Sequence, residues 1–319
     1  MNSRSIVGPL VSVLVPAFNH QEYIECCLES IAKSGYAPIE ILVIDDGSSD
    51  DTYVRAVSWM ENHAHKIKRV AIHQQTNQGV VRTLNTLVSM ACGEYIALVA
   101  SDDELEPNGI ALRVSALQRH SEWLAVFGDC TMIDATGLQI AASYLESTCH
   151  AHFPALVNPR RIARELILRW SVSGPSMLAR RSAYDPDVGA GLYDERLVVE
   201  DRDFYLRLLS INALGFIPER VARYRLHDLN TVALRNSIVT RDVVAAEWSS
   251  TKSFRGLNRC LLTLVAIRGS ARLRAECLTE EGNLMRGQMV GLFGKLLAII
   301  LRCAYFLHRF LSRPYETRL

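Results

Sequence analysis

Two pairs of adjacent carboxylates stand close behind apolar runs in this sequence. Asp45 and Asp46 follow IEILVI, and Asp102 and Asp103 follow YIALVAS. Short apolar runs bounded by turn residues are typical of buried strands, so each pair is expected where a strand leaves the core. Hard cations such as Mg²⁺ and Mn²⁺ bind one or two carboxylates together with substrate phosphates. The two pairs therefore indicate a site for a nucleotide diphosphate and a divalent cation.

A third acidic group, formed by Glu200, Asp201 and Asp203, opens the amphipathic stretch EDRDFYLRLLSI, which predicts a helix. Free backbone N–H groups at a helix N-terminus favour a charged carboxylate, so Asp201 is expected to stay ionised at neutral pH. An ionised carboxylate can take a proton from an attacking hydroxyl. Acids at turns and in first helical turns are also common simply as caps, and that alternative is open for this group and for the pair at 102–103.

The spacing of apolar segments predicts how these residues are positioned. Over the first hundred residues, short apolar runs alternate with amphipathic stretches, which predicts parallel strands joined by helices. The expected strands are 11–15, 39–45, 69–73 and 95–100, and the expected helices are 22–34, one that begins at 48–50, and 79–91. Doubly wound sheets of this kind bind ligands at the carboxyl ends of their strands, where both carboxylate pairs would lie. Further expected elements are a strand at 124–134, helices at 160–170 and 200–211, a broken strand at 215–227, and helices after 236.

Composition narrows the class of protein. The 319 residues are 49% hydrophobic and 22% charged, which suits one large domain or two smaller ones. A formal net charge of +1 gives no basic field of the kind that binds nucleic acid. The eight cysteines include no C-x-x-C pair and indicate neither a zinc site nor a disulfide framework. Because MNSRSIVGPL has no charged segment followed by an apolar one, the protein is expected to be cytoplasmic.

The order of the motifs resembles that of the family-2 inverting glycosyltransferases with the GT-A fold, of the bacterial surface-polysaccharide type. The resemblance covers about residues 10–232 and is carried by VSVLVPAFNHQEYIECCLESI, IEILVIDDGSSDDT, NQGVVRTLN, GEYIALVASDDELEPN, SGPSMLARRSAY, GLYDERLVVEDRDFYLRL and ARYRLHDLNT. It implies an α/β fold with a Rossmann-like, mostly parallel central sheet flanked by helices. It also implies a glycosyltransferase domain over 1–235, with a nucleotide-binding half at about 1–100 and a metal and acceptor half at 101–235, and a helical extension over 236–319.

The resemblance implies roles for residues of a donor site. The residues matched to nucleotide binding are Pro16, Ala17, Phe18, Asn19, Asp45, Asp46, Arg82 and Asp102. The residues matched to a Mn²⁺ or Mg²⁺ ion are Asp103 as the chief ligand, then Asp102 and His227. A solvated Arg82 and a structural hydrogen-bonding His227 are the alternatives. The chain departs from many family members at Ala100, where they have a further acid, so the number of carboxylate ligands is open.

The resemblance also implies an acceptor side. Inversion of the anomeric centre needs a base on the face opposite the leaving diphosphate, and the family match assigns this role to Asp201, with Asp203 as the fallback. Acceptor binding is matched to Gly174, Pro175 and Glu200.

The C-terminal stretch 285–312 predicts a nearly continuous helix with a narrow polar stripe. The stripe consists of Gln288, Lys295, Arg302 and Arg309, which recur every seven residues. Crossing a bilayer would bury two of these cations at a cost of about 2.5–3.5 kcal/mol each, so the pattern favours a helix lying in the membrane surface. The apolar residues expected to enter the membrane are Leu292, Phe293, Leu296, Ile300, Phe306 and Phe310. Packing on the catalytic domain or on a second copy in a homodimer is the alternative.

These observations together predict a metal-dependent inverting glycosyltransferase. It would move a sugar from a nucleotide-diphosphate donor, expected to be a UDP-sugar, to a lipid-linked glycan in surface polysaccharide synthesis such as O-antigen or capsule, as a peripheral protein on the inner face of the cell membrane. Two alternatives stay open: a non-catalytic nucleotide-binding member of a glycan assembly complex, and a nucleotidyltransferase. The second usually needs a Gly-rich basic loop after the first strand, and PAFNHQEY has neither feature.

Overall fold

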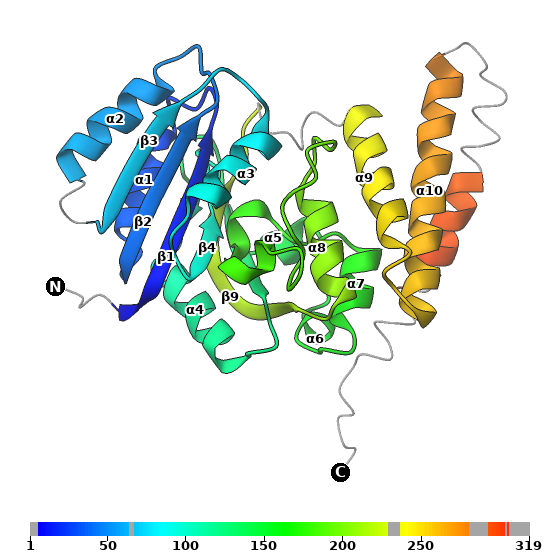
Figure 1. Ribbon diagram of the computed structural model, residues 1–319. Helices are drawn as coiled ribbons and strands as arrows, with labels where there is room; N and C mark the ends of the chain where they lie inside the picture. The colour runs from blue at the N-terminus through cyan, green and yellow to red at the C-terminus, as the bar shows by residue number, and fades with distance from the viewer. Residues whose placement is uncertain (1–5, 64–66, 229–236, 281–292, 304, 306–319) are drawn as a thin grey trace.

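Within the described residues, a nine-stranded sheet forms the centre of the molecule (Figure 1). The structure is a computed structural model that describes residues 6–63, 67–228, 237–280, 293–303 and 305. The strands are β1 (Ile6–Ala17), β2 (Tyr36–Asp45), β3 (Arg69–Gln74), β4 (Tyr95–Leu98), β5 (Glu104–Leu105), β6 (Ala125–Ile133), β7 (Gln139–Ala141), β8 (Met177–Arg180) and β9 (Leu214–Arg225). The helices of the sheet-bearing region are α1 (Ile24–Ala32), α2 (Thr52–His63), α3 (Val80–Met90), α4 (Gly109–Arg119), α5 (Tyr144–Ser147), α6 (Phe153–Leu156), α7 (Ile162–Leu168) and α8 (Asp201–Ser210).

The four strands β3, β2, β1 and β4 lie side by side and are parallel. Within this part of the sheet, β1, β2 and β4 are covered on both faces, and each contains a nearly continuous apolar run, whereas β3 is a partly exposed edge strand. Val13 faces one hydrophobic cluster together with Ile24 of α1, while the adjacent Leu14 faces the other together with Leu84 of α3. The predicted parallel strands and their crossover helices are thereby confirmed.

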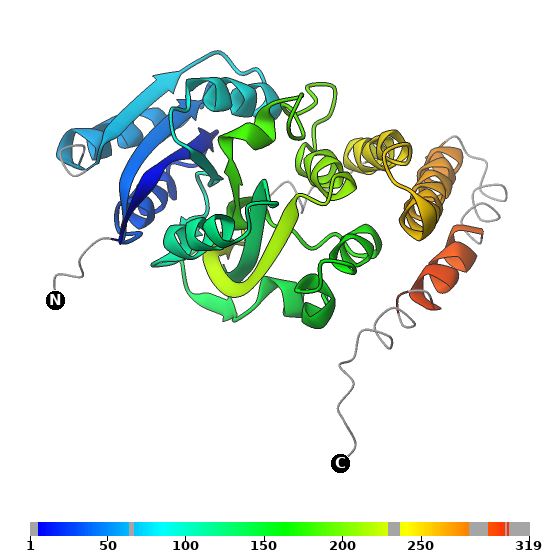
Figure 2. The ribbon, with the colours of Figure 1, turned by 60° about the horizontal axis from the view of Figure 1, so that its bottom comes forward.

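The second half of the sheet is mixed rather than parallel. β8 runs antiparallel to both β4 and β6, while β6 and β9 are parallel. β9 was expected as a broken strand, but it is one strongly curved strand whose pairing with β6 shifts register near Asp129 (Figure 2). Such irregular pairing bends a strand, and it carries the end of β9 toward the carboxyl end of β4.

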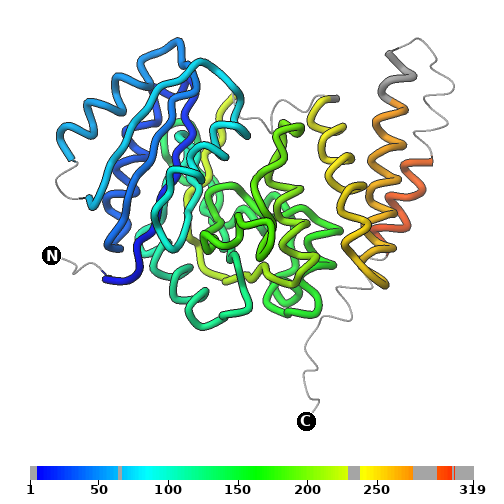
Figure 3. Tube along the Cα trace, viewed as in Figure 1, coloured from blue at the N-terminus to red at the C-terminus, as the bar shows by residue number. Residues whose placement is uncertain are grey.

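Helices α9 (Ser237–Ser250) and α10 (Gly256–Glu280) lie at the end of the molecule opposite β1–β3 (Figure 3). They pack against α8 and α7, and Leu262 and Leu301 join the same hydrophobic cluster as Phe204 of α8. The expected helical character after residue 236 is confirmed for the described residues. The boundary at 235 between a catalytic domain and a helical extension stays a prediction.

Residues 293–303 are helical, in agreement with part of the expected helix at 285–312. Several residues assigned to its polar stripe or apolar face lie outside the described residues: Gln288, Leu292, Phe306, Arg309 and Phe310. Across the described part of the chain, no helix is both long enough and apolar enough to span a bilayer.

Candidate active site

The carboxyl ends of β1, β2 and β4 meet at one edge of the sheet, because the three strands are parallel. Ala17, at the end of β1, pairs with Asp45 at the end of β2, and the N–H of Val99, just after β4, donates to the Leu14 carbonyl at 3.0 Å. The segments that follow these three strands therefore surround one region. The structure brings the expected nucleotide residues and the second carboxylate pair to the same edge, as doubly wound sheets do for their ligands.

Asn19 joins the loops that follow β1 and β2. Its backbone is left-handed, with φ of 53°, a conformation that Asn tolerates better than most residues. Its N–H donates to Ser48 Oγ at 2.9 Å, and its side-chain oxygen accepts from the N–H of Ser49 at 2.9 Å. The neighbouring Phe18 ring is 45% exposed beside this junction, whereas Ala17 is buried.

The first carboxylate pair is engaged by the protein itself. Asp45 accepts a hydrogen bond from Gln74 Nε2 at 3.0 Å. The two carboxyl oxygens of Asp46 accept from the N–H groups of Gln78 and Gly79, each at 2.8 Å. Asp46 therefore orders the loop that leads into α3, and a direct contact with a nucleotide base stays a prediction.

Two imidazoles and one carboxylate converge at the end of β4. His227, just after β9, has its Nε2 2.9 Å from Asp102 Oδ2. His20, just after β1, has its Nδ1 2.7 Å from Ser101 Oγ and 3.9 Å from Asp102 Oδ1. One possible ligand atom from each of His20, Asp102 and His227 lies within 4.8 Å of the other two. Nitrogen and carboxylate oxygen donors at this spacing fit a divalent cation.

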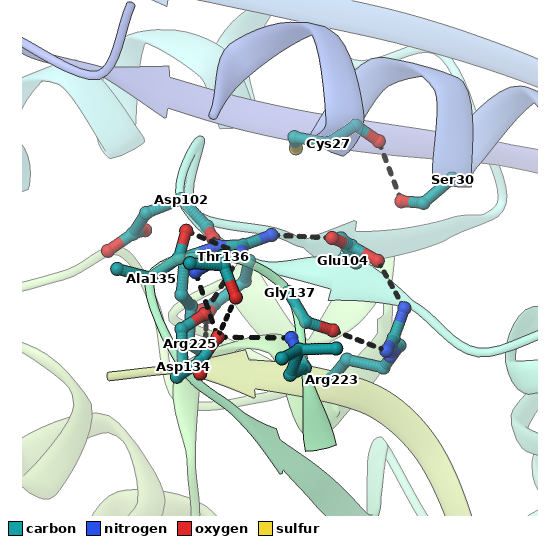
Figure 4. Close-up of polar contacts among 12 residues, drawn as sticks. Cys27, Ser30, Asp102, Glu104, Asp134, Ala135, Thr136, Gly137, Arg223 and Arg225 are labelled. Carbon is teal, nitrogen blue, oxygen red and sulfur yellow. Dashed lines mark hydrogen bonds and ion pairs between the residues drawn. The ribbon is translucent and has the colours of Figure 1, made fainter. Parts of the chain in front are cut away.

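Asp103 is buried and hydrogen-bonded to the backbone of β9. It is 2% exposed, and its Oδ1 accepts from the backbone N–H of Arg225 at 2.9 Å. The Arg225 side chain donates to the Asp102 carbonyl at 2.7 Å and to the Asp134 carbonyl at 3.1 Å, and it also pairs with Glu104 (Figure 4). That Asp103 is the chief ligand stays a prediction, and the carboxylate grouped with the two imidazoles is that of Asp102. The two adjacent side chains diverge where the chain turns, and Asp102 is the one that meets the imidazoles.

Electrostatics separate the same two carboxyls. Burial, together with the negative charge of Asp102, holds the pKa of Asp103 well above its usual value. Burial also acts on Asp102, but the hydrogen bond from His227 and the interaction with His20 outweigh it and lower the pKa of Asp102. Burial lowers the pKa of His20, which favours its neutral imidazole. Asp102 is therefore the anion of the pair, and a neutral imidazole beside it is in the form that binds metals.

Asp201 is the first residue of α8, and its Oδ1 accepts from the N–H of Arg202 at 2.6 Å. The pKa of Asp201 is raised well above its usual value by burial and by the negative charge of Glu200. The sequence argument expected the helix N-terminus to keep this carboxyl readily ionised, and the direction is wrong because burial and the like charge outweigh the helix N–H groups. The fallback, Asp203, pairs with Arg207 at 2.8 Å within α8.

Tyr224 of β9 connects the two carboxylate regions. The pKa of its phenol is raised by burial and then by the negative charges of Asp103, Asp102 and Asp201. Its ring contacts that of Tyr144 with centroids 5.2 Å apart. The charges of Asp102 and Asp201 therefore both act on the Tyr224 phenol.

The expected acceptor segment forms a short 3₁₀ helix, η2 (Gly174–Ser176), beside the ends of β4, β6 and β9. Arg113, fully buried in α4, donates to the carbonyls of Pro175 at 3.1 Å and Met177 at 2.8 Å. Among the described residues, apart from Gly174 itself and its two chain neighbours, no atom lies within 4 Å of the position that a Cβ on Gly174 would occupy. Arg113 of α4 thus fixes this segment, and the described residues leave space beside the Gly174 Cα.

Helix α3 holds the segment that precedes Asp201. Asn85 Nδ2 donates to the Tyr193 carbonyl at 3.0 Å, and the Tyr193 N–H donates back to Asn85 Oδ1 at 3.0 Å. Arg82 Nε lies 3.4 Å from Glu195 Oε2. Arg82 therefore contacts the segment that precedes α8, and a contact with a donor phosphate stays a prediction.

Sequence reasoning did not find His20, Arg225 or Tyr224. The signal for His20 was present, since it follows the first strand directly after Asn19, at the edge where the other strands place their polar residues. Arg225 and Tyr224 had no comparable signal. Their roles depend on the curvature of β9, which brings residues more than a hundred positions apart into contact.

Comparison with known proteins agrees with this arrangement. Residues 12–185 match the model of glycosyl transferase family 2. The chondroitin synthase of Escherichia coli is 33% identical over 136 residues, which are 43% of this chain and 19% of that protein. An uncharacterized glycosyltransferase of Haemophilus influenzae is 27% identical over 236 residues, covering 72% of this chain and 69% of its relative. The chain thus spans less than a fifth of the first relative and about two thirds of the second.

Two solved structures show the same fold at low sequence identity. S. aureus TarS in complex with UDP-GlcNAc has a TM-score of 0.58 and 20% identity, covering 84% of this chain and 72% of that one. A mannosyltransferase from Pyrobaculum calidifontis in complex with GDP-Man and Mn²⁺ has a TM-score of 0.59 and 17% identity, covering 97% and 88%. With the family model matching more than half of its residues, the chain belongs to the family-2 glycosyltransferases and has the GT-A fold.

Proposed function

We propose that the protein transfers a glycosyl group, with inversion, from a UDP-sugar to a glycan carried on a lipid. One observation supports this above the others. In a family-2 chain, the Asp102 cluster has ligand atoms close enough to share a cation, and the charges of both Asp102 and Asp201 act on the Tyr224 phenol. The cluster suits a metal-bound diphosphate, and Asp201 suits a hydroxyl. A nucleotidyltransferase loses support because the family model matches residues 12–185.

The donor would lie against the ends of β1 and β2. Exposed Phe18 offers a ring for stacking, while Asn19, Asp45 and Asp46 hold the surrounding loops in place. The solved neighbours contain UDP-GlcNAc in one case and GDP-Man in the other, which supports a nucleoside diphosphate sugar in general. UDP as the specific carrier is our proposal.

Asp102 and His227 would hold a Mn²⁺ or Mg²⁺ ion. Such an ion, when bound, stabilises the charge that develops on the departing diphosphate. Asp103 contributes indirectly, because its bond to the Arg225 N–H ties the end of β4 to the end of β9 and sets the direction in which Asp102 points.

Asp201 would act as the base. As the acceptor oxygen attacks the anomeric carbon, its proton passes to the Asp201 carboxylate, and the bond from that carbon to the diphosphate oxygen breaks with the electron pair on the oxygen. A carboxyl whose pKa lies above its usual value is a stronger base, which suits proton transfer near neutral pH. Glu200 and the segment Gly174–Pro175 would position the acceptor.

We also propose contact with a membrane through the helix at 293–303. One face packs on the domain: Leu297 and Leu301 are buried, and Tyr305 OH donates to the His150 carbonyl at 3.1 Å. The other face is exposed and apolar, with Phe293, Leu296, Ile299 and Ile300 between 46% and 56% exposed. The exposed Lys295 and Arg302 lie on the same helix. The buried face supports packing on the domain, and the exposed apolar face supports contact with a membrane.

Calorimetric titration with UDP, GDP and dTDP, with and without Mn²⁺, tests the proposed donor site. UDP should bind, and Mn²⁺ should tighten its binding in the wild type and in the surface control Glu61→Gln but not in Asp102→Asn. Binding of GDP or dTDP in preference to UDP would change the proposed carrier. Failure of all three nucleotides to bind would overturn the assignment of this site.

A further inference from the structure

His20 lies beside Asp102, and the reaction proposed above gives it no role. We propose that His20 is a third protein ligand of the divalent cation and that the resulting donor set, two imidazoles and one carboxylate, makes the site select Mn²⁺ over Mg²⁺. The inference rests on the proposed metal-dependent function and specifies the chemistry of its cation.

Three contacts hold His20 at the end of β4. Its backbone N–H donates to Thr52 Oγ1 at 2.8 Å, which fixes the loop after β1. Its Nδ1 lies 2.7 Å from Ser101 Oγ, and its ring meets that of His227 edge to face, with centroids 5.5 Å apart and planes at 87°. Contacts from three separate segments therefore place an imidazole beside Asp102.

Among the residues that the structure describes, no second carboxylate belongs to the cluster. Asp103 is directed to the backbone of Arg225, and position 100, at the start of the same turn, is an alanine. Over the part of the chain that the structure describes, His20, Asp102 and His227 are the one group of three such side chains with ligand atoms close enough to share an ion. The protein's contribution is thus two nitrogens and one carboxylate group.

Donor type determines which cation such a site prefers. Mg²⁺ takes oxygen ligands in near-ideal octahedral geometry and gives up its waters reluctantly. Mn²⁺ shares the carboxylate and water ligands of Mg²⁺, but it is also the first member of the transition-metal series, whose ions take imidazole nitrogen as a ligand. Replacing one imidazole nitrogen by a carboxylate oxygen should therefore reduce the difference between the Mn²⁺ and Mg²⁺ affinities. Removing the nitrogen without replacement should lower the Mn²⁺ affinity more than the Mg²⁺ affinity.

Binding of Mn²⁺ in the presence of UDP, followed by the EPR signal of free Mn²⁺ and by competition with Mg²⁺, measures this preference directly without turnover. The variants are His20→Ala, His20→Asp and His20→Asn, and His63→Ala removes an imidazole elsewhere as the control. In His20→Ala the Mn²⁺ dissociation constant should rise at least about tenfold. Substituting residues that only orient a metal ligand already lowers metal affinity by about that factor. His20→Asp should recover Mn²⁺ binding while lowering the Mn²⁺ to Mg²⁺ affinity ratio, and His63→Ala should match wild type.

His20→Asn distinguishes a ligand from a residue that only orients Ser101, since its amide can still hydrogen-bond the Ser101 hydroxyl. If His20 is a ligand, His20→Asn should resemble His20→Ala. Mn²⁺ affinity and selectivity equal to wild type in the Ala or Asn variant would overturn the inference while leaving the proposed function standing. A wild-type protein that binds neither UDP nor Mn²⁺ would instead overturn the proposed function itself.

Discussion

At the scale of single residues, two neighbouring aspartates have opposite surroundings. Asp102 meets two imidazoles and has a lowered pKa, whereas Asp103 is buried against the backbone of Arg225 and has a raised one. The first is suited to bind a cation and the second to hold two strand ends together. Adjacent acids in a turn are therefore not interchangeable.

Substituting each aspartate by asparagine should separate these roles. Asp102→Asn removes the anionic ligand, so Mn²⁺ affinity measured with UDP present should fall at least about tenfold. Asp103→Asn keeps an oxygen that can accept from the Arg225 N–H, so its Mn²⁺ affinity should stay close to wild type. The reverse order of the two losses would restore Asp103 as the chief ligand.

The pH dependence of kcat/KM should report the unusual carboxyl at the start of α8. A base acts only when deprotonated, so activity should fall as the pH drops through the raised pKa of Asp201, with an acidic limb above that of an ordinary aspartate. Glu200→Gln removes the like charge, which lowers the pKa of Asp201 and should move that limb to lower pH. A limb that stays in place, or moves upward, would argue against Asp201 as the titrating base.

At the scale of elements, the helices after residue 236 support the helix that carries Asp201. Arg202 Nη2 pairs with Glu247 Oε1 of α9 at 3.0 Å, and both side chains are about 5% exposed. The N–H of Val198 donates to Asp242 Oδ2, also of α9, at 2.7 Å. Helix α9 thus contacts the chain on both sides of Asp201, so it is part of the support for the candidate base.

Removing one partner of the buried pair should be costly. Glu247→Ala leaves the Arg202 guanidinium buried without its carboxylate, so the free energy of unfolding should fall by about 3–5 kcal/mol. Lys33→Ala breaks the exposed Lys33–Glu29 pair of α1 as a control and should cost about 1 kcal/mol or less. Urea unfolding of both variants measures the difference, and equal losses would show that α9 does not stabilise α8 through this pair.

The sequence predicts the parallel half of the sheet well because its strands are buried on both faces and its helices have clear apolar faces. Helix α4 escapes prediction because Arg113 lies in its buried face, where the guanidinium is satisfied by backbone carbonyls of a distant segment. The strand β8 has only four residues, which are too few to show the alternation of apolar and polar residues that predicts a strand. β9 seemed broken because Pro218 interrupts it, yet a curved strand tolerates that residue where its side chain is exposed.

The sequence predicts which segments form the site, but it does not predict which side chains contact one another there. The strand ends that carry Asn19, Asp46 and Asp102 follow from the alternation of strands and helices. Whether Asp102 or Asp103 faces a cation depends on Arg225, more than a hundred residues away, and on the path of β9. Long-range partners of this kind leave no periodic trace in one sequence.

At the scale of the whole molecule, the strands β1–β3 and the helices α9 and α10 lie at opposite ends (Figure 3). Residues 285–319 carry six Lys or Arg against one Glu, and two of these cations, Lys295 and Arg302, are exposed on the described helix 293–303. A basic helix with exposed apolar side chains suits an anionic membrane surface. A membrane contact there would leave the β1–β3 end free to receive a nucleotide from solution.

Sedimentation with vesicles that contain anionic lipid tests the membrane contact. Lys295→Gln and Arg302→Gln should each weaken binding about fivefold, equivalent to about 1 kcal/mol per cation near the surface. Leu296→Ser together with Ile300→Ser should weaken it further, whereas Val54→Ser on exposed α2 should not. Wild-type protein that ignores such vesicles but elutes as a dimer would assign this face to a second copy of the chain.

Release of nucleoside diphosphate from a panel of UDP-, GDP- and dTDP-sugars, in the presence of Mn²⁺ and a lipid-linked glycan acceptor, tests the central claim most directly. We predict release from a UDP-sugar by the wild type, with loss of at least about a hundredfold in kcat for Asp201→Asn, as expected for removal of a general base. Asp102→Asn should lose activity in parallel with its Mn²⁺ affinity. Turnover that survives unchanged in both variants would contradict the account, because the reaction would then use neither the proposed cation site nor the proposed base.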